Sequence, residues 1–284
     1  PKYSGNAMGG VIDIESRQPL GEEWAFQTTA WLQDWELFES KGNAPGYKTF
    51  FAHGNKIGKL SYYIFYNRLE GQTQPTNTTV KNSVSTGSNS AVTGVNNFID
   101  SRVRDSIAYA DDGEENITND LFKLKMNYEF SSKFKLRGMI GFLDRHRDQE
   151  NVNNYINNGS GRKLWIGTLS FNGKKFVVAE NDFNVSKQDK QDLLAGIGAS
   201  GKFGDGWNYD AVISAYTVLQ DVARDSDQNP ESDAFDNGGQ LKEFSGTGWQ
   251  LFEMRLNKDA FLTRSDLSFE GGYHYDHASL KVAN

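Results

Sequence analysis

The chain has 284 residues, a formal net charge of −7 and a mean hydropathy of −0.64, so its bulk charge does not favour nucleic acid as a partner. No window of about 18 apolar residues occurs, which excludes a transmembrane helix but leaves a transmembrane barrel open, because only alternate residues of a barrel strand face lipid. Cysteine is absent, which excludes disulfides and thiolate metal sites. The aromatic content of 13%, with 29 glycines and only 5 prolines, suits an all-β protein.

The chain opens with a motif in which two adjacent glycines precede a β-branched run, Gly5-Asn6-Ala7-Met8-Gly9-Gly10-Val11-Ile12-Asp13-Ile14. Paired glycines permit positive φ and close approach of a neighbouring surface, and the run that follows alternates apolar and acidic residues like a half-exposed strand. Pro19 ends it. Two glycines alone would mark an ordinary turn, but the whole string resembles the end of the plug domain in TonB-dependent outer-membrane receptors. The positions that match the plug signature are Gly5, Ala7, Gly9 and Gly10.

The resemblance implies that residues 1–19 are the C-terminal end of a plug and that residues 20–284 are the N-terminal part of a 22-stranded barrel. We therefore expect an internal fragment, with an antiparallel up-and-down transmembrane β-barrel portion of about nine strands. Such receptors lie in the outer membrane of Gram-negative bacteria and import scarce solutes, most often ferric siderophores and sometimes cobalamin, other metals or saccharides. The implied partners are the solute, outer-membrane lipid and the TonB complex, which would bind a segment upstream of this chain.

Period-two alternation of apolar and polar residues predicts about nine strands in the remainder of the chain. The clearest pair surrounds the turn at 131–133, with Met126 on the apolar face of the first strand and Lys125 on the other. We expect Met126 and Ile213 to face lipid, and Lys125 and Asp210 to face the lumen. The predicted strands lie at about 23–33, 47–54, 60–66, 122–130, 134–142, 193–199, 209–219, 252–256 and 267–275.

The connections between these strands alternate between short and long. Short turns are predicted near 55, 132, 205 and 261, and long polar loops near 40, 95, 165 and 234, the first being the shortest. Short periplasmic turns alternating with long external loops are typical of an outer-membrane barrel. Aromatic residues flank the short turns, as in an interfacial girdle. Inside one long loop, a small hairpin is predicted around Asn172-Gly173.

Candidate ligand contacts lie in the loop from about 145 to 187. Arg145, His146 and Arg147 stand where a strand would emerge, and they either form a basic rim that attracts an anionic ferric chelate or simply end a strand at the lipid headgroups. A charged strand end at the lipid headgroups is the commoner of these two explanations. Asn153 and Tyr155 belong to a run of amides with one aromatic, suited to hydrogen bonding and stacking. The alternative is an external loop without ligand contact, and both interpretations stay open.

Two acidic segments invite a metal interpretation. Residues 225–229 have the D-x-D-x-N spacing of calcium loops, but Pro230 replaces the required glycine and no helices flank the segment, so a solvated loop is favoured. Residues 111–115 are likewise interpreted as solvated acid. The four histidines are few and scattered. No metal site and no cofactor are expected.

The sequence also bears on other classes of protein. An enzyme is not expected, because no G-x-S-x-G elbow occurs and no histidine pairs obviously with a carboxylate at a strand end. A porin-like or adhesive outer-membrane barrel without TonB coupling is the principal alternative. A soluble β-sandwich would alternate similarly, but the long polar stretch at about 70–118, taken to lack apolar content, disfavours it.

Overall fold

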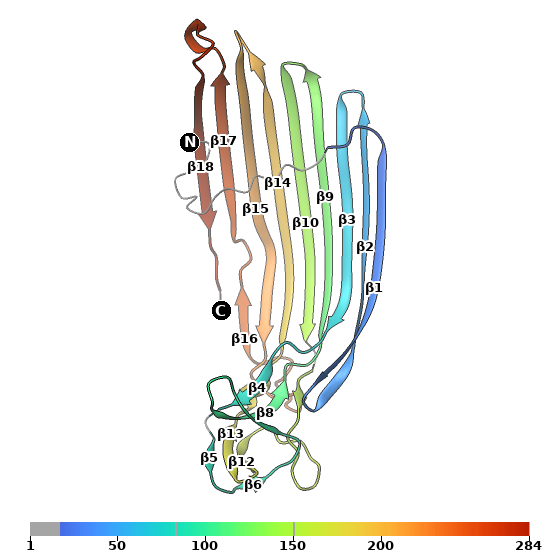
Figure 1. Cartoon of the computed structure of the whole chain (residues 1–284), viewed down its shortest axis with the longest axis vertical. Helices are drawn as coiled ribbons and strands as arrows, with labels where there is room; N and C mark the ends of the chain where they lie inside the picture. The colour runs from blue at the N-terminus through green and yellow to red at the C-terminus, as the bar shows by residue number, and fades with distance from the viewer. Residues whose placement is uncertain (1–17, 83, 150, 284) are drawn as a thin grey trace.

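A computed structural model of the chain describes residues 18–82, 84–149 and 151–283 (Figure 1). The plug-like motif, with Gly5, Ala7, Gly9 and Gly10, lies outside the described residues, as does nearly all of the predicted 1–19 segment. Within the described part, no helix is long and apolar enough to cross a membrane. The only helices there are two short 3-10 turns, η1 (Glu180–Phe183) and η2 (Phe261–Thr263).

The protein is all-β, as predicted, and its main element is one large antiparallel sheet. Nine strands follow one another across this sheet in chain order, and β16 (Gln240–Glu243) adds a short pairing to β15. Among the described residues, the outermost strands β1 and β18 pair with no further strand, so the sheet is open. The nine strands are β1 (Glu23–Leu37), β2 (Ser40–Ile57), β3 (Leu60–Thr73), β9 (Glu115–Ser131), β10 (Phe134–Gln149), β14 (Ser186–Phe203), β15 (Trp207–Asp225), β17 (Gly248–Lys258) and β18 (Phe269–Ser279).

The alternation of short and long connections is confirmed at every junction but the first. Turns of a few residues join β2 to β3, β9 to β10 and β14 to β15, and η2 lies in the connection from β17 to β18. The prediction of a long loop near 40 was wrong, because β1 and β2 meet in the two-residue turn Phe38-Glu39. Nothing in those residues signals a turn, and Phe38 takes a φ of 52° that is uncommon outside glycine.

The register gives the sheet one continuous apolar face, as the alternation predicted. Met126 and Ile213 lie on this face and are 45% and 55% exposed, whereas Lys125 and Asp210 lie on the opposite face. On that opposite face, Arg137 donates two hydrogen bonds of 2.7 Å to the carboxylate of Asp210. One row of partners across seven strands of the apolar face reads Tyr62, Met126, Gly138, Ile197, Ile213, Phe252 and Tyr275.

The long loops fold together at one end of the main sheet, which the sequence did not predict (Figure 1). We call this part, residues 76–113 and 151–185, the loop domain. It contains two four-stranded sheets, and one pair, β6 with β12, is parallel. The predicted hairpin is confirmed, with Asn172 and Gly173 both at positive φ between β12 and β13. The strands are β4 (Thr78–Lys81), β5 (Ser85–Thr86), β6 (Ser90–Ala91), β7 (Asn96–Ile99), β8 (Asp105–Asp111), β11 (Asn153–Asn154), β12 (Gly167–Phe171) and β13 (Lys174–Val178).

The loop domain has a hydrophobic core of its own, so the expectation of loops without apolar content was wrong. Tyr109 is fully buried against the rings of Phe176 and Phe183, both 5.9 Å away between centroids. Its core residues come from both segments of the loop domain, and Phe235 joins them from the loop between β15 and β17. The buried core consists of Val92, Val95, Ile107, Tyr109, Ala110, Val152, Ile156, Leu169, Phe176, Val178, Phe183, Val185 and Phe235.

Asp182 is a partly buried carboxylate of the loop domain that pairs with Lys81. Burial alone would raise the pKa of Asp182, but hydrogen bonds from Lys81 Nζ (2.8 Å) and the Ala179 N–H (2.9 Å) outweigh it and hold the pKa below its ordinary value. A lowered pKa contributes stability that is present above the unfolded value of about 4 and is lost as pH falls through the folded one.

We therefore expect the loop domain to lose protection from amide exchange as pH falls below about 4, and the variant Asp182→Asn to lose that part of the pH dependence. Hydrogen exchange of the β4 and β8 amides against pH measures this directly. An identical acid profile in the wild type and Asp182→Asn would contradict the assignment.

Candidate functional site

A cleft lies where the loop domain meets the turn between β1 and β2. Its volume is about 780 Å³, within the range of pockets that enclose a drug-sized ligand. Two tryptophans and one tyrosine share its lining with six side-chain amides and two charges of each sign. The lining residues are Trp35, Glu39, Ser40, Lys41, Gln72, Gly94, Glu114, Asn116, Asn151, Val152, Asn153, Asn154, Tyr155, Asn157, Lys163 and Trp165.

Trp35 lies near the end of β1, where a hydrogen bond and a packing contact position its indole ring. Its Nε1 donates a hydrogen bond of 3.2 Å to Glu114 Oε1. Its ring covers Gly42, the residue directly opposite on β2, because a Cβ built at Gly42 would lie only 2.8 Å from Trp35 Cζ2. Four residues earlier on the same face, Trp31 covers Gly46 in the same way. Because these two β2 glycines have no Cβ, the indole rings can pack directly against the backbone of the strand.

Gly46→Ala is expected to destabilise the sheet by about 1–3 kcal/mol, because the new Cβ would lie 2.3 Å from Trp31 Cζ2 and the indole must move. Denaturant titration gives the free energy of unfolding, and a shift in tryptophan emission reports the displaced ring. The matched control is Gly138→Ala, where the nearest atom to the Cβ is the Gly196 carbonyl oxygen at 3.9 Å. Equal costs at the two positions would rule out the seating role.

The four charged side chains of the cleft are not used in ion pairs within the described chain. Glu39 Oε1 accepts a hydrogen bond from the Asn96 amide at 3.1 Å, and Glu114 accepts one from the Trp35 indole. Lys41 and Lys163 have no carboxylate within salt-bridge distance among the described residues. Burial lowers the pKa of Lys163. Lys41 is the cross-strand partner of Glu36 and therefore lies on the opposite face of the sheet from Trp35, so the charges that line the cleft on the Trp35 side are Glu39, Glu114 and Lys163.

Asn153 and Tyr155, both predicted as ligand contacts, line the cleft but also bind a buried carboxylate. Asp111 is fully buried and accepts hydrogen bonds from Asn153 Nδ2 (2.7 Å), the Tyr155 hydroxyl (2.5 Å) and the Ser40 hydroxyl. Tyr155 is only 3% exposed, and burial together with Asp111 raises the pKa of its hydroxyl. These contacts tie the loop domain to the β1–β2 turn. The interpretation of Asp111 as solvated acid was therefore wrong.

The basic triplet does not form a rim, because successive strand residues point to opposite faces. Arg145 and Arg147 lie on one face, where Arg145 donates to Gln188 Oε1 (3.0 Å) and Arg147 pairs with Glu115 (2.7 Å). His146 lies on the apolar face and pairs with Asp189, a contact that the sequence had not indicated. None of the three lines the cleft.

The calcium-like segment makes ordinary polar contacts. Asp225 accepts from Lys242 Nζ at 2.6 Å, and Asn229 donates to Glu180 at 2.9 Å. In the described part of the chain, no group of three or more histidine, aspartate or glutamate side chains could hold a metal ion.

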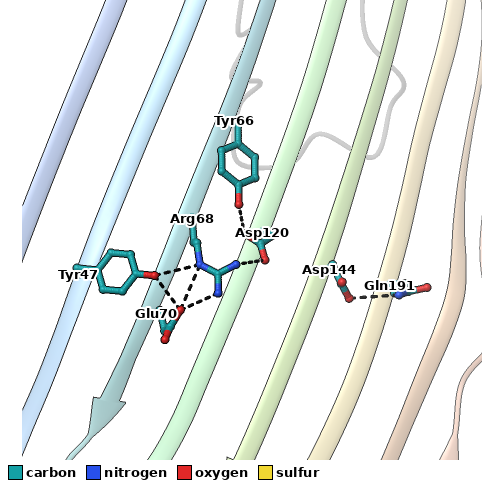
Figure 2. A network of polar contacts seen from close by, with 7 residues as sticks. All are labelled: Tyr47, Tyr66, Arg68, Glu70, Asp120, Asp144 and Gln191. Atoms are coloured by element: carbon teal, nitrogen blue, oxygen red, sulfur yellow. Dashed lines mark hydrogen bonds and ion pairs between the residues drawn. The ribbon is translucent and has the colours of Figure 1, made fainter.

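A row of polar side chains crosses the apolar face at the end nearest the loop domain, and we call it the polar belt. Figure 2 shows its centre, where Arg68 donates to Glu70 (2.7 Å) and Asp120 (2.8 Å). The Tyr47 hydroxyl donates to Glu70 at 2.8 Å, and Tyr66 bonds Asp120. The same register continues through the remaining members Asp144, His146, Asp189 and Gln191.

Most of the cleft could not be predicted from the sequence, because its walls come from β1, β2, β3, the start of β9 and two separate loops. The amide run at 151–158 was the one signal that pointed to it. Comparisons of the chain with known protein families, with curated proteins and with solved structures gave no match.

Proposed function

We propose that this chain is the first part of the barrel of a TonB-dependent outer-membrane receptor, which imports a scarce solute, with a ferric siderophore as the leading candidate. The observation that carries the proposal is the nine-stranded antiparallel meander with one continuous apolar face. A water-soluble protein rarely exposes so large an apolar surface, whereas a membrane barrel requires one.

The height of the apolar band supports this proposal. On β9 the band runs from the polar belt at Asp120 to the aromatic residue Phe130, about ten residues or about 34 Å along the strand. A strand tilt of 35–45° reduces this to about 25 Å, the height of the apolar band on outer-membrane barrels. At its far end, rings stack in pairs near the short turns, such as Phe130 with Phe134 and Phe203 with Trp207. These rings suit the aromatic girdle at a membrane interface.

The asymmetry of the two ends supports an orientation. The connections β2–β3, β9–β10, β14–β15 and β17–β18 lie at one end, and the folded loop domain lies at the other together with the short β1–β2 turn. Apart from that turn, this is the arrangement expected of periplasmic turns and external loops. The cleft would then lie on the external side, where a solute arrives. The resemblance of residues 3–14 to the end of a plug supports TonB coupling over a porin-like or adhesive barrel.

Uptake of a labelled ferric chelate by cells that carry the full-length receptor, with and without a functional TonB, tests this function. We expect uptake only when TonB is present. Equal uptake without TonB would favour a passive barrel. A protein that stays soluble without detergent and does not insert into vesicles would overturn the membrane assignment itself.

A further inference from the structure

We infer that the cleft binds a small organic cation, of the class in which an aliphatic chain carries an ammonium group at each end. The inference goes beyond the proposed function, because it assigns a ligand to this cleft whether or not the protein couples to TonB. It rests on the carboxylates of the lining, on a buried carboxylate beneath them and on the indole rings beside them.

The charge of the cleft is the first argument. On the Trp35 side the lining carries the carboxylates of Glu39 and Glu114 and the ammonium group of Lys163. Burial lowers the pKa of Lys163, so desolvation already disfavours the one positive charge. Beneath the lining, Asp111 is fully buried, and the hydrogen bonds that it accepts from described residues all come from uncharged donors. The cleft therefore stabilises a cation better than a neutral or anionic ligand.

The contact between a carboxylate and an indole is the second argument. Glu114 Oε1 accepts a hydrogen bond from Trp35 Nε1 at 3.2 Å. A Cβ built at Gly42 would lie 2.6 Å from that oxygen and 2.8 Å from Trp35 Cζ2, so both groups lie over the same glycine. Glu114 Oε2 accepts no hydrogen bond from the described residues. An ammonium group at this place can meet a carboxylate oxygen and an aromatic ring at once.

The rest of the lining is the third argument. Glu39, in the β1–β2 turn, supplies a second carboxylate, whose Oε1 accepts only a neutral amide hydrogen bond among the described residues, from Asn96. The indoles of Trp35 and Trp165 provide apolar surface for methylene groups. A chain with an ammonium group at each end can use both carboxylates and this surface together. The volume of about 780 Å³ leaves room for such a ligand.

Equilibrium dialysis against the full-length protein in detergent micelles, at neutral pH and low salt, tests the inference. The labelled probe is cadaverine, a five-carbon chain with two terminal ammonium groups. The unlabelled competitors are cadaverine itself, the diol and the dicarboxylate of the same chain, and Mg²⁺ at matched ionic strength. The Mg²⁺ arm separates the cleft from the general attraction of cations to a chain of net charge −7.

We expect cadaverine to bind at least about tenfold more tightly than each of the other three competitors, a difference of about 1.4 kcal/mol. Equal displacement by the diol, the dicarboxylate or Mg²⁺, or no binding of the probe, would overturn the inference. Because the assay contains neither TonB nor iron, its failure would leave the receptor function standing. A lack of TonB-dependent uptake would in turn leave the cadaverine site standing.

Glu114→Gln tests the carboxylate beside the indole. The glutamine keeps an oxygen that accepts from the Trp35 indole, so the ring stays in place while the charge is lost. We expect cadaverine to bind about tenfold more weakly. The matched control is Glu231→Gln, the same change at an exposed residue outside the cleft, which should leave the affinity unchanged. Equal affinities of the two variants would remove the cleft from the binding site.

Two further variants test the remaining charge and the aromatic surface. Lys163→Gln is expected to strengthen cadaverine binding about threefold, a gain that misfolding cannot produce, and an unchanged or weaker affinity would contradict the charge argument. Trp35→Leu is expected to weaken binding about two- to fivefold. Trp24→Leu, 63% exposed on the other face of β1, should have no effect, and equal effects at the two tryptophans would exclude a role for the Trp35 ring.

Discussion

Lysine at Met126 is expected to lower the stability of the protein in a lipid bilayer by about 2–4 kcal/mol. Met126 lies on β9 midway along the apolar band, 45% exposed, with Tyr62 and Gly138 as its partners on the two neighbouring strands. An ammonium group there would stand near the centre of the hydrocarbon layer, too far from either headgroup region to extend to water without distortion.

The matched control is Lys125→Gln, the neighbouring residue on the opposite face, where removal of a charge from the lumen of the proposed barrel should cost little. Refolding of the full-length form of the proposed receptor into lipid vesicles, titrated with denaturant, gives both free energies. Equal losses of stability in the two variants would mean that the two faces of the sheet have the same environment, which would contradict the assignment. A detergent-only measurement is a useful third arm, because micelles adapt to a buried charge and the Met126→Lys cost should shrink in them.

The sequence predicted the main sheet well because its strands have one apolar and one polar face. That contrast produces an alternation of apolar and polar residues that can be recognised from one sequence alone, as on β9, where Met126 follows Lys125. The strand ends were predicted less well. β1 and β2 extend beyond their predicted ends to the turn at Phe38-Glu39. The added residues have a polar sequence, and the indole rings of Trp35 and Trp31 stabilise them by packing over Gly42 and Gly46.

The loop domain could not be predicted in the same way. Its core joins residues such as Val92, Tyr109, Phe176 and Phe235, which are far apart in the chain and have no common period. Only contact between loops makes them a core. The one local signal that succeeded was Asn172-Gly173, because a two-residue turn is determined by its own backbone preferences.

The same limit explains the site. The sequence predicted Asn153 and Tyr155 as ligand contacts in a loop. In the structure both line the cleft, but each also donates a hydrogen bond to the buried Asp111 carboxylate. An acidic run such as 111–115 is usually solvated, and no sequence pattern distinguishes a carboxylate that will be surrounded by donors from three other segments. Deleting residues 151–161 would also remove the buried Ile156, so point variants test binding better than a deletion does.

Asp111→Ala is expected to destabilise the loop domain by at least about 3 kcal/mol, without unfolding the main sheet. The carboxylate is fully buried, and its loss leaves Asn153 Nδ2 and the Gly113 N–H without this acceptor. The Ser40 and Tyr155 hydroxyls keep the Leu37 carbonyl oxygen, which both of them would then share. Each buried donor left unsatisfied costs about 1–3 kcal/mol. Hydrogen exchange at β8 and β11, compared with exchange at β9 and β10, separates the local effect from a global one.

The matched control is Asp233→Ala, which removes an exposed carboxylate that forms no ion pair in the described part of the chain and should leave exchange unchanged. Asp111→Asn should fall between the two, because an amide keeps one acceptor oxygen but places an NH₂ group against donors. If β8 in Asp111→Ala stays as protected as in the wild type, the carboxylate does not hold the loop domain to the β1–β2 turn. If the main sheet also loses protection in Asp111→Ala, the loop domain and the sheet unfold as one cooperative unit. The contacts of Asp111 and Tyr155 with the β1–β2 turn would then hold the end of the sheet as well as the loop domain.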